Sequence, residues 1–239
     1  MNQRFSGKVA LVSGGTGGLG RAVSLAFLAE GAHVVVPYFE QTEFDDLKTA
    51  AAEHASMLEG SSVDVTDDAA IQSYVDDVVS KHGRLDTVVN TVGGYAGGLK
   101  LWEMDPKVFT RMLHLNLRSG FALSRAVVPA MLKQGHGVIV NVAAKAAVDH
   151  AAGASAYASS KAAAVAMIDS LAADLIGTGV RVNSILPSII DTKANRSTMP
   201  DADFSKWPKP EDIARVILFL CSDDATVIHG AAIPVYGNN

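Results

Sequence analysis

The chain has 239 residues, of which 49% are hydrophobic and 19% are charged, so it can build one large core and is not a disordered chain. Its formal net charge of −5 argues against a nucleic-acid-binding protein, which needs clustered lysine and arginine. The longest apolar run, 162–168, is too short to cross a membrane, and the single cysteine, Cys221, suits a reducing compartment. We therefore expect one cytoplasmic domain over residues 1–239 that binds neither membranes nor nucleic acid.

Segments typical of strands and helices alternate along the chain. Runs of β-branched residues predict strands at 8–13, 33–36, 87–92, 137–142, 180–186 and 231–236. Apolar periodicity predicts helices at 19–31, 67–81, within 106–133, at 155–176 and at 211–220. Several strands are apolar throughout, as in a parallel sheet that is covered on both faces. The alternation predicts an α/β fold with a single Rossmann-type, doubly wound parallel sheet of about seven strands.

A proline-containing segment, TMPDADFSKWPKP at 198–210, interrupts this alternation late in the chain. It is longer than a plain connection between two elements. We expect a substrate loop at about 188–210, and a loose surface insertion is the alternative. Whether the loop closes on a ligand stays open.

A glycine-rich loop, SGGTGGLG at 13–20, lies between the first predicted strand and the first predicted helix. Glycines allow a tight turn and let backbone N–H groups approach a pyrophosphate at the helix N-terminus, so this placement indicates a dinucleotide site. An acid at the end of the second strand would select NAD over NADP. Tyr38 occupies that place and Glu40 follows it, so the preference stays open.

Tyr157 and Lys161 are four residues apart on a predicted helix, so their side chains share one face. A nearby ammonium group is expected to lower the pKa of the phenol and to make Tyr157 an acid–base group near neutral pH. Pairs at this spacing also occur by chance on exposed helices. The dinucleotide loop that precedes the pair favours the catalytic interpretation.

Taken in order, these pieces resemble the short-chain dehydrogenase/reductase superfamily over essentially the full length. The resemblance also rests on Asp64, Leu85-Asp86, Asn90, Asn116, Arg181-Val182-Asn183, Pro187, Asp191-Thr192 and GAAIPV at 230–235. It implies that Tyr157, Lys161 and Asn116 are catalytic, with Asn116 anchoring the water of a proton relay, and that the protein is a homodimer or homotetramer. It implies that NAD or NADP contacts Gly14, Thr16, Gly18, Leu19, Gly20, Tyr38, Asp64, Val65, Asn90, Gly93, Tyr157, Lys161, Pro187, Ile190 and Thr192.

One position departs from the superfamily pattern, because Ala144 occupies the place of the serine expected thirteen residues before Tyr157. In the superfamily that hydroxyl helps to bind the carbonyl oxygen of the substrate. Loss of one such donor typically lowers the rate by about 10²–10³-fold. Three explanations stay open: an inactive protein, a hydroxyl supplied by Ser155 or Ser188, or a substrate that does not need the hydroxyl.

Three segments are similar to the dihydropteridine reductases, which also have alanine at this position. They are GGYAGG at 93–98, AKAAVDH at 144–150 and DTKANRSTMPDADFSKW at 191–207. The resemblance implies an NAD(P)H-dependent oxidoreductase that transfers hydride to a flat, activated C=N or quinone-like acceptor, with quinonoid dihydropterin as the best candidate. Charge then develops over ring nitrogens rather than on one carbonyl oxygen. Candidate substrate residues are Tyr95, which could stack on a flat ring, Ala144, Lys145, Asn195, Met199 and Trp207.

Two alternatives remain beside this hypothesis. One is a carbonyl reductase that acts on a 3-oxoacyl or ketone substrate. The other is a catalytically inactive NAD(P)-sensing protein, although the retained Tyr157, Lys161 and Asn116 argue against it. The seven histidines lack metal-ligand spacing, so we expect no metal site and a small molecule as the substrate.

Overall fold

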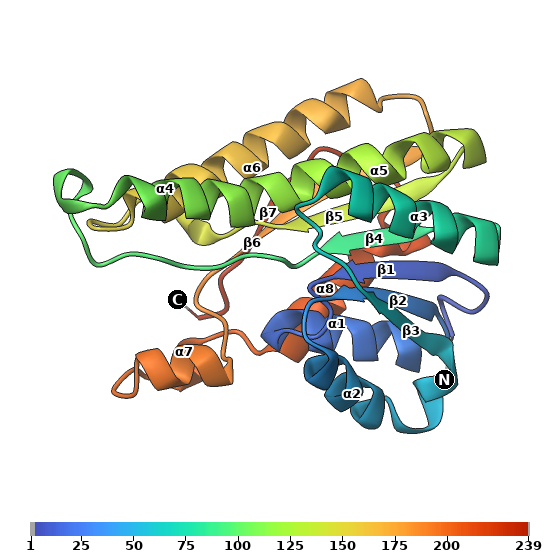
Figure 1. The fold of residues 1–239 in the computed structure, drawn as a ribbon, viewed down its shortest axis with the longest axis horizontal. Coiled ribbons are helices and arrows are strands. Elements are labelled where there is room, and N and C mark those ends of the chain that lie inside the picture. Colours follow the sequence, from blue (N-terminus) through green and yellow to red (C-terminus); the bar gives the residue numbers. More distant parts are fainter. Residues whose placement is uncertain (1–2, 239) are drawn as a thin grey trace.

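A parallel sheet of seven strands forms the centre of the computed structural model, which describes residues 3–238 (Figure 1). The strand order is β3-β2-β1-β4-β5-β6-β7, and every neighbouring pair is parallel. This topology confirms the predicted doubly wound sheet. The strands are β1 (Val9–Ser13), β2 (His33–Tyr38), β3 (Leu58–Ser62), β4 (Thr87–Asn90), β5 (Gly137–Val142), β6 (Val180–Pro187) and β7 (Ala232–Val235).

Two layers of helices cover the sheet, because successive side chains of a strand point to opposite faces. In β1, Ala10 and Val12 join the core beneath α1, α2 and α8, whereas Val9 and Leu11 join the core beneath α3, α5 and α6. Figure 1 shows these two groups of helices on opposite sides of the sheet. No helix within residues 3–238 is long and apolar enough to cross a membrane. The helices are α1 (Gly18–Ala29), α2 (Gln41–Ala50), α3 (Asp68–His82), α4 (Pro106–Leu113), α5 (Ser119–Gln134), α6 (Ser155–Asp174), α7 (Lys193–Thr198) and α8 (Pro210–Cys221).

The helical stretch expected within 106–133 contains a wider turn. Helices α4 and α5 are joined by a π-helical turn at His114–Arg118, in which Asn116 lies. A π turn bonds each residue to the fifth along the chain and is frequent at functional sites. The turn places Asn116 in the interior, with 2% of its surface exposed.

Three elements were missing from the expectations: β3, α2, and the six-residue helix α7, which lies within the expected substrate loop. Strand β3 at the edge of the sheet reads LEGSS, and only Leu58 among its five residues is a large apolar side chain. Helix α2 buries only Phe44 and Leu47. Neither segment has the apolar pattern that identifies the buried elements. Short 3-10 helices complete the chain at η1 (Ala52–Met57), η2 (Leu101–Glu103), η4 (Lys145–Ala147), η5 (Phe204–Lys206) and η6 (Asp223–Ala225).

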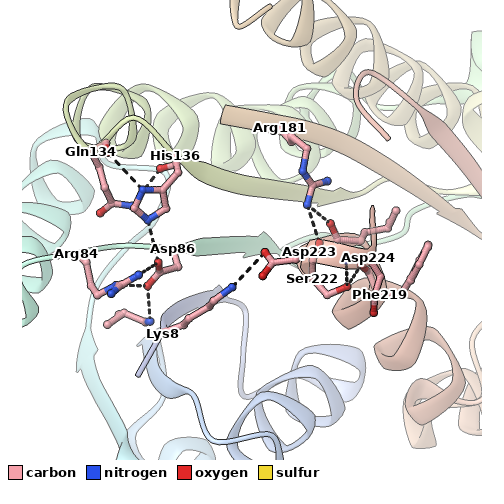
Figure 2. A network of polar contacts seen from close by, with 12 residues as sticks. Lys8, Arg84, Asp86, Gln134, His136, Arg181, Phe219, Ser222, Asp223 and Asp224 are labelled. Atoms are coloured by element: carbon pink, nitrogen blue, oxygen red, sulfur yellow. Dashed lines mark hydrogen bonds and ion pairs between the residues drawn. The ribbon is translucent and has the colours of Figure 1, made fainter. Parts of the chain in front are cut away.

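A polar network around Asp86 stabilises the amino-terminal edge of the sheet (Figure 2). The Asp86 carboxylate is 5% exposed and accepts hydrogen bonds from the backbone N–H of Val9 at 2.8 Å and from the Arg84 guanidinium at 2.8 and 2.5 Å. His136 Nε2 lies 3.1 Å from the same carboxylate. Burial opposes ionisation of Asp86, but the bonds from Arg84 and Val9 outweigh it and lower the pKa of the carboxyl.

Arg181 belongs to the same edge, where it caps the end of α8 (Figure 2). Its Nη2 donates to the carbonyl oxygens of Leu220 at 2.9 Å and Ser222 at 3.1 Å. A cation at this place satisfies carbonyl groups that the helix itself leaves unpaired. A hollow of about 500 Å³ lies beside Arg181 and Asp86, whose charged groups are bonded to the protein. This edge therefore serves the fold, and the candidate site lies at the other edge.

Candidate functional site

The candidate residues gather where the carboxyl ends of β1 and β4 lie side by side. In the sheet, β1 lies between β2 and β4. The chain runs from β1 to β3 toward one edge of the sheet and from β4 to β7 toward the other, so the strand order reverses between β1 and β4. Ligands of open α/β sheets bind at such a switch point, outside the carboxyl ends of the strands. The glycine loop follows β1, and the GGYAGG segment follows β4. In Figure 1 this edge of the sheet faces α4 and α7.

The glycine loop forms a cradle of backbone atoms that side chains would fill. Gly14 has a φ of +75°, and a Cβ on it would lie 2.7 Å from Thr91 Oγ1. A Cβ on Gly20 would collide with the carbonyl oxygen of Gly14, and a Cβ on Gly18 would lie 2.9 Å from Thr192 Cγ2. The loop and Thr192 therefore meet, although more than 170 residues of chain separate them. This cradle fits the pyrophosphate of a dinucleotide, which needs close approach of the backbone at a helix N-terminus.

The remaining candidates near β2 and β3 fall into two groups, two at or just after the ends of these strands and two buried in the core. Tyr38 is the last residue of β2, and Asp64 is an exposed residue shortly after β3. Asp64 accepts hydrogen bonds from the hydroxyl and the backbone N–H of Thr66, and these bonds lower the pKa of its carboxyl. Leu19 and Val65 are buried in the core, with 8% and 9% of their surfaces exposed.

Asn90 fixes the path of the chain at the end of β4. Its Nδ2 donates to Asn141 Oδ1 at 3.0 Å, and its Oδ1 accepts a hydrogen bond from the N–H of Val92 at 3.3 Å. These bonds orient the segment that leads to Gly93.

Gly93, Asn116 and Lys161 come together next to this segment. A Cβ on Gly93 would lie 2.8 Å from Asn116 Oδ1 and 3.0 Å from Lys161 Nζ. Asn116 accepts a hydrogen bond from the N–H of Gly94 at 2.9 Å and donates to the Gly94 carbonyl oxygen at 3.0 Å. The π turn is thus bonded to the loop after β4, and three of the predicted residues form one cluster.

Ser160 connects this cluster to Tyr157. Asn116 Nδ2 donates to Ser160 Oγ at 2.9 Å, and Ser160 Oγ donates to the carbonyl oxygen of Tyr157 at 2.7 Å. The first turn of α6, the π turn and the loop after β4 are therefore linked by a continuous set of hydrogen bonds.

The electrostatics of the tyrosine–lysine pair differ from the expectation. Lys161 is 5% exposed and donates to the carbonyl oxygen of Val142 at 3.0 Å, and burial lowers its pKa to about 8. Burial, with a further contribution from Tyr95, raises the pKa of Tyr157 to about 12. The expectation that the ammonium lowers the pKa of the phenol is wrong in this structure, because burial dominates.

Tyr95 stands directly beside Tyr157. The two rings meet edge to face, with centroids 5.0 Å apart and an interplanar angle of 74°, and 66% of Tyr95 is exposed. A Cβ on Gly97 would collide with the Tyr95 hydroxyl. The N–H of Gly98 donates to the carbonyl oxygen of Gly153 at 3.0 Å, which ties the loop after β4 to the segment before α6.

Ala144 lies just before η4, which packs against α6. The residue is 7% exposed and extended, with φ −166° and ψ 158°. Neither suggested replacement for the missing serine fits. Ser188 donates its hydroxyl hydrogen to the carbonyl oxygen of Tyr236 at 2.7 Å, and Ser155 is two residues from Tyr157 on one helix, so the two side chains do not face each other.

The other substrate candidates lie on two short helices. Thr192 caps α7 by accepting a hydrogen bond from the N–H of Asn195 at 3.2 Å, and Asn195 Nδ2 donates to the carbonyl oxygen of Ile190 at 2.8 Å. Ile190 follows β6, which ends at Pro187, and Met199 directly follows α7. Lys145 Nζ, on η4, lies 3.5 Å from an Asp149 carboxylate oxygen and 5.2 Å from the centre of the Tyr236 ring.

Contacts within the predicted substrate loop hold its two ends together. The N–H of Asp191 donates to the carbonyl oxygen of Pro208 at 3.0 Å. Arg196 pairs with the Asp191 carboxylate at 2.5 Å and lies over the Phe204 ring, 4.7 Å from its centre. Trp207 is 7% exposed and packs on Phe204, with ring centroids 4.9 Å apart. These contacts argue against a loose surface insertion and make Trp207 part of the base of the loop.

Sequence reasoning missed three residues of this region. Asn141 had a detectable signal, since it is a polar residue inside an otherwise apolar strand. Ser160 and Thr91 had none, because their contacts join segments that are distant in the sequence. Within residues 3–238, no group of three or more histidine, cysteine, aspartate or glutamate side chains could hold a metal ion.

Comparisons with known proteins agree with this geometry. A family model described as short chain dehydrogenase matches residues 8–203. A 3-oxoacyl-[acyl-carrier-protein] reductase from Thermotoga maritima is 34% identical, over 98% of each chain. A 7alpha-hydroxysteroid dehydrogenase from Escherichia coli is also 34% identical, over 99% of this chain and 95% of its own.

A solved structure gives the same picture in three dimensions. A 7alpha-hydroxysteroid dehydrogenase complexed with NADH and 7-oxo glycochenodeoxycholic acid superimposes with a TM-score of 0.89 and 31% identity, over 100% of this chain and 96% of that one. None of these three names describes a pterin reductase, so the resemblance to the dihydropteridine reductases stays a prediction from local segments.

Proposed function

Since the chain belongs to the short-chain dehydrogenase/reductase superfamily and is an NAD(P)-dependent oxidoreductase, we propose that it reduces a flat, activated C=N or quinone-like acceptor, with quinonoid dihydropterin as the best candidate. The observation that carries this proposal is the buried methyl group of Ala144 where the superfamily has a carbonyl-binding hydroxyl. The exposed Tyr95 ring, edge to face with Tyr157, supports it by offering a flat surface beside the proton donor.

The glycine cradle would hold the pyrophosphate of the cofactor, and Lys161 would bind the ribose next to the nicotinamide. When bound, the reduced nicotinamide supplies a hydride. Tyr157 would give the proton from its hydroxyl, which is protonated at neutral pH because its pKa is about 12. The phenolate left behind would be stabilised by the Lys161 ammonium, which has little water around it.

Asn116 would act by position as well as through a relay. Its amide holds Gly94 and Ser160 in place and so fixes both the loop below Tyr95 and the first turn of α6. Its Oδ1 has a second lone pair, which would bind the water that returns a proton to Tyr157.

The acceptor explains why Ala144 is compatible with catalysis. A ketone concentrates negative charge on one oxygen in the transition state, so a missing donor lowers the rate by about 10²–10³-fold. A conjugated heterocycle spreads the charge over several ring atoms, and a hydroxyl at one point then contributes less.

A carbonyl reductase is the second candidate. Its support is the identity of 34% to a 3-oxoacyl reductase and to a hydroxysteroid dehydrogenase, over nearly the whole chain. Such an enzyme would work without the hydroxyl, because Ser188 already donates to Tyr236 and Ser155 does not face Tyr157.

The deciding assay follows oxidation of NADH and of NADPH with quinonoid dihydropterin generated in the cuvette, beside 3-oxoacyl thioesters, small ketones and quinones. We expect kcat/KM for the pterin or the quinones to exceed that for every ketone by at least about tenfold. Higher values for a ketone or a 3-oxoacyl thioester would reject the proposal in favour of the second candidate.

Two variants sharpen this assay. Ala144→Ser should raise ketone reduction by up to about 10²-fold and leave reduction of the flat acceptor unchanged or lower. Ala146→Ser, two residues further along, is the matched control and should change neither activity. Tyr157→Phe should abolish reduction of both acceptor classes, and normal turnover by this variant would remove Tyr157 from the mechanism.

A further inference from the structure

Helix α2 presents a carboxylate to the glycine loop. The hydroxyl of Thr16, in that loop, donates to Glu43 Oε2 at 2.9 Å. Glu43 lies in the first turn of α2 and is exposed, and within residues 3–238 it forms no ion pair with a lysine or arginine. A negative charge is thus held against the backbone cradle and is not neutralised by a neighbouring cation.

The usual place for a ribose-binding acid is taken by a residue that cannot serve as one. Tyr38 ends β2, its hydroxyl donates to Gln41 Oε1 at 2.5 Å, and its ring stacks on Phe44 with centroids 4.7 Å apart. The phenol is therefore fixed against α2, and the acid that reaches the glycine loop comes from the next helix.

The charges around this place are predominantly negative. Residues 40–50 contain four carboxylates and one lysine, Lys48, which lies in the last turn of α2. The glycine loop at 13–20 contains no lysine or arginine. Arg21, the first cation after the loop, donates to the carbonyl oxygen of Asp46 at 3.2 Å.

We propose that Glu43, positioned by Thr16, makes the protein select NADH over NADPH. This inference rests on the proposed function, since it concerns the cofactor of the same site. A ribose hydroxyl is a donor that a carboxylate can accept, whereas the 2′-phosphate of NADPH carries negative charge and needs an arginine or lysine. Glu43 thus favours binding of NADH and repels the 2′-phosphate of NADPH.

Equilibrium binding tests this selection without any substrate. NADH and NADPH are titrated separately into the full-length protein, and the dissociation constants are obtained from nicotinamide fluorescence. We expect NADPH to bind at least about tenfold more weakly, a difference of about 1.4 kcal/mol. Glu43→Gln should reduce this ratio at least about fivefold, mostly through tighter binding of NADPH.

Two further variants separate the position of Glu43 from the general charge of α2. Asp46→Asn removes a carboxylate one turn further along, and it should leave the ratio within about twofold. Thr16→Val keeps the Glu43 charge but removes the hydroxyl that holds it, and it should lower the ratio part of the way.

The outcomes are distinguishable. Equal affinity of the unmodified protein for both dinucleotides, or an unchanged ratio in Glu43→Gln, overturns the inference and leaves the proposed function in place. An equal effect of Asp46→Asn and Glu43→Gln also overturns it, because selection would then belong to the whole helix. If neither dinucleotide shows saturable binding, the proposed function itself fails.

Discussion

Replacing Asn116 with leucine should loosen the cluster at the heart of the candidate site. Asn116 is 2% exposed and makes three hydrogen bonds with nitrogen and oxygen groups, two with Gly94 and one with Ser160, beside a weak one to Met112 Sδ at 3.7 Å. Leucine has a similar size, so the loss is mainly polar. At about 1 kcal/mol for each hydrogen bond, the free energy of unfolding should fall by about 3 kcal/mol. In a domain of this size each kcal/mol lowers Tm by about 2–4 °C, so a drop of about 6–12 °C is expected.

Asn183→Leu is the matched control for this experiment. Asn183 is fully buried in β6 and makes two hydrogen bonds, to the carbonyl oxygen of Ile228 and from the N–H of Ala231, both at 3.0 Å. It should lose about 2 kcal/mol of stability and keep its kcat.

Thermal unfolding followed by circular dichroism gives Tm, and steady-state kinetics well below both transitions gives kcat. We expect Asn116→Leu to lose kcat at least about tenfold. A Tm within about 2 °C of the parent, or an equal loss of kcat in Asn183→Leu, would refute the argument that Asn116 positions the loop and Tyr157.

Three further outcomes follow from the same structure. Burial lowers the pKa of Lys161 from 10.5 to about 8, so between these pH values the unfolded chain binds more protons than the folded one, and the parent becomes more stable as pH rises. In urea unfolding, the free energy of unfolding of the parent should therefore rise relative to that of Lys161→Met by about 2–3 kcal/mol from pH 7.5 to 10. A difference between the two proteins that stays constant with pH would contradict the burial argument. Gly93→Ala would place a Cβ 2.8 Å from Asn116 Oδ1 and 3.0 Å from Lys161 Nζ, so kcat at saturating cofactor should fall at least about tenfold. An unchanged kcat would show that the cluster can shift without loss of activity. The pKa of Asp86 is lowered, so its carboxylate contributes stability above the unfolded value of 3.8 and loses it as pH falls through the folded pKa. Asp86→Asn should cost about 1–3 kcal/mol of unfolding free energy at pH 7, and this cost should shrink as pH falls below 3.8. A cost that does not change with pH would count against the ionic network.

Strong apolar patterns identified most of the fold. Five of the six predicted strands lie inside the sheet and are rich in apolar residues, as in VIVNV within β5, whose bounds of 137–142 agree with the structure. Strand β3 and helix α2 lie at one edge of the sheet, where one side is exposed and few apolar residues are needed. Their positions depend on pairing with β2 and on contacts from Phe44, which local sequence does not reveal.

The candidate site was predictable where its chemistry is local in the sequence. The glycine loop and the spacing of Tyr157 and Lys161 need only neighbouring residues to be recognised. The bonds of Asn116 reach 22 residues back to Gly94 and 44 residues forward to Ser160, so no spacing rule could have found them. The raised pKa of Tyr157 was missed for the same reason, because burial is a property of the folded chain.

The π turn at His114–Arg118 also has a consequence for how this chain tolerates deletions. A π turn holds about one residue more than an α turn, so the stretch from α4 to α5 contains one residue beyond what a regular helix would need. Removing Leu117 would let the turn close into a regular helix while α4 and α5 keep the same faces toward their neighbours. The residues of the turn, Asn116 among them, would lose their present positions. Loss of a single codon would thus yield a folded protein without its catalytic arrangement, which separates the capacity to fold from the capacity to react.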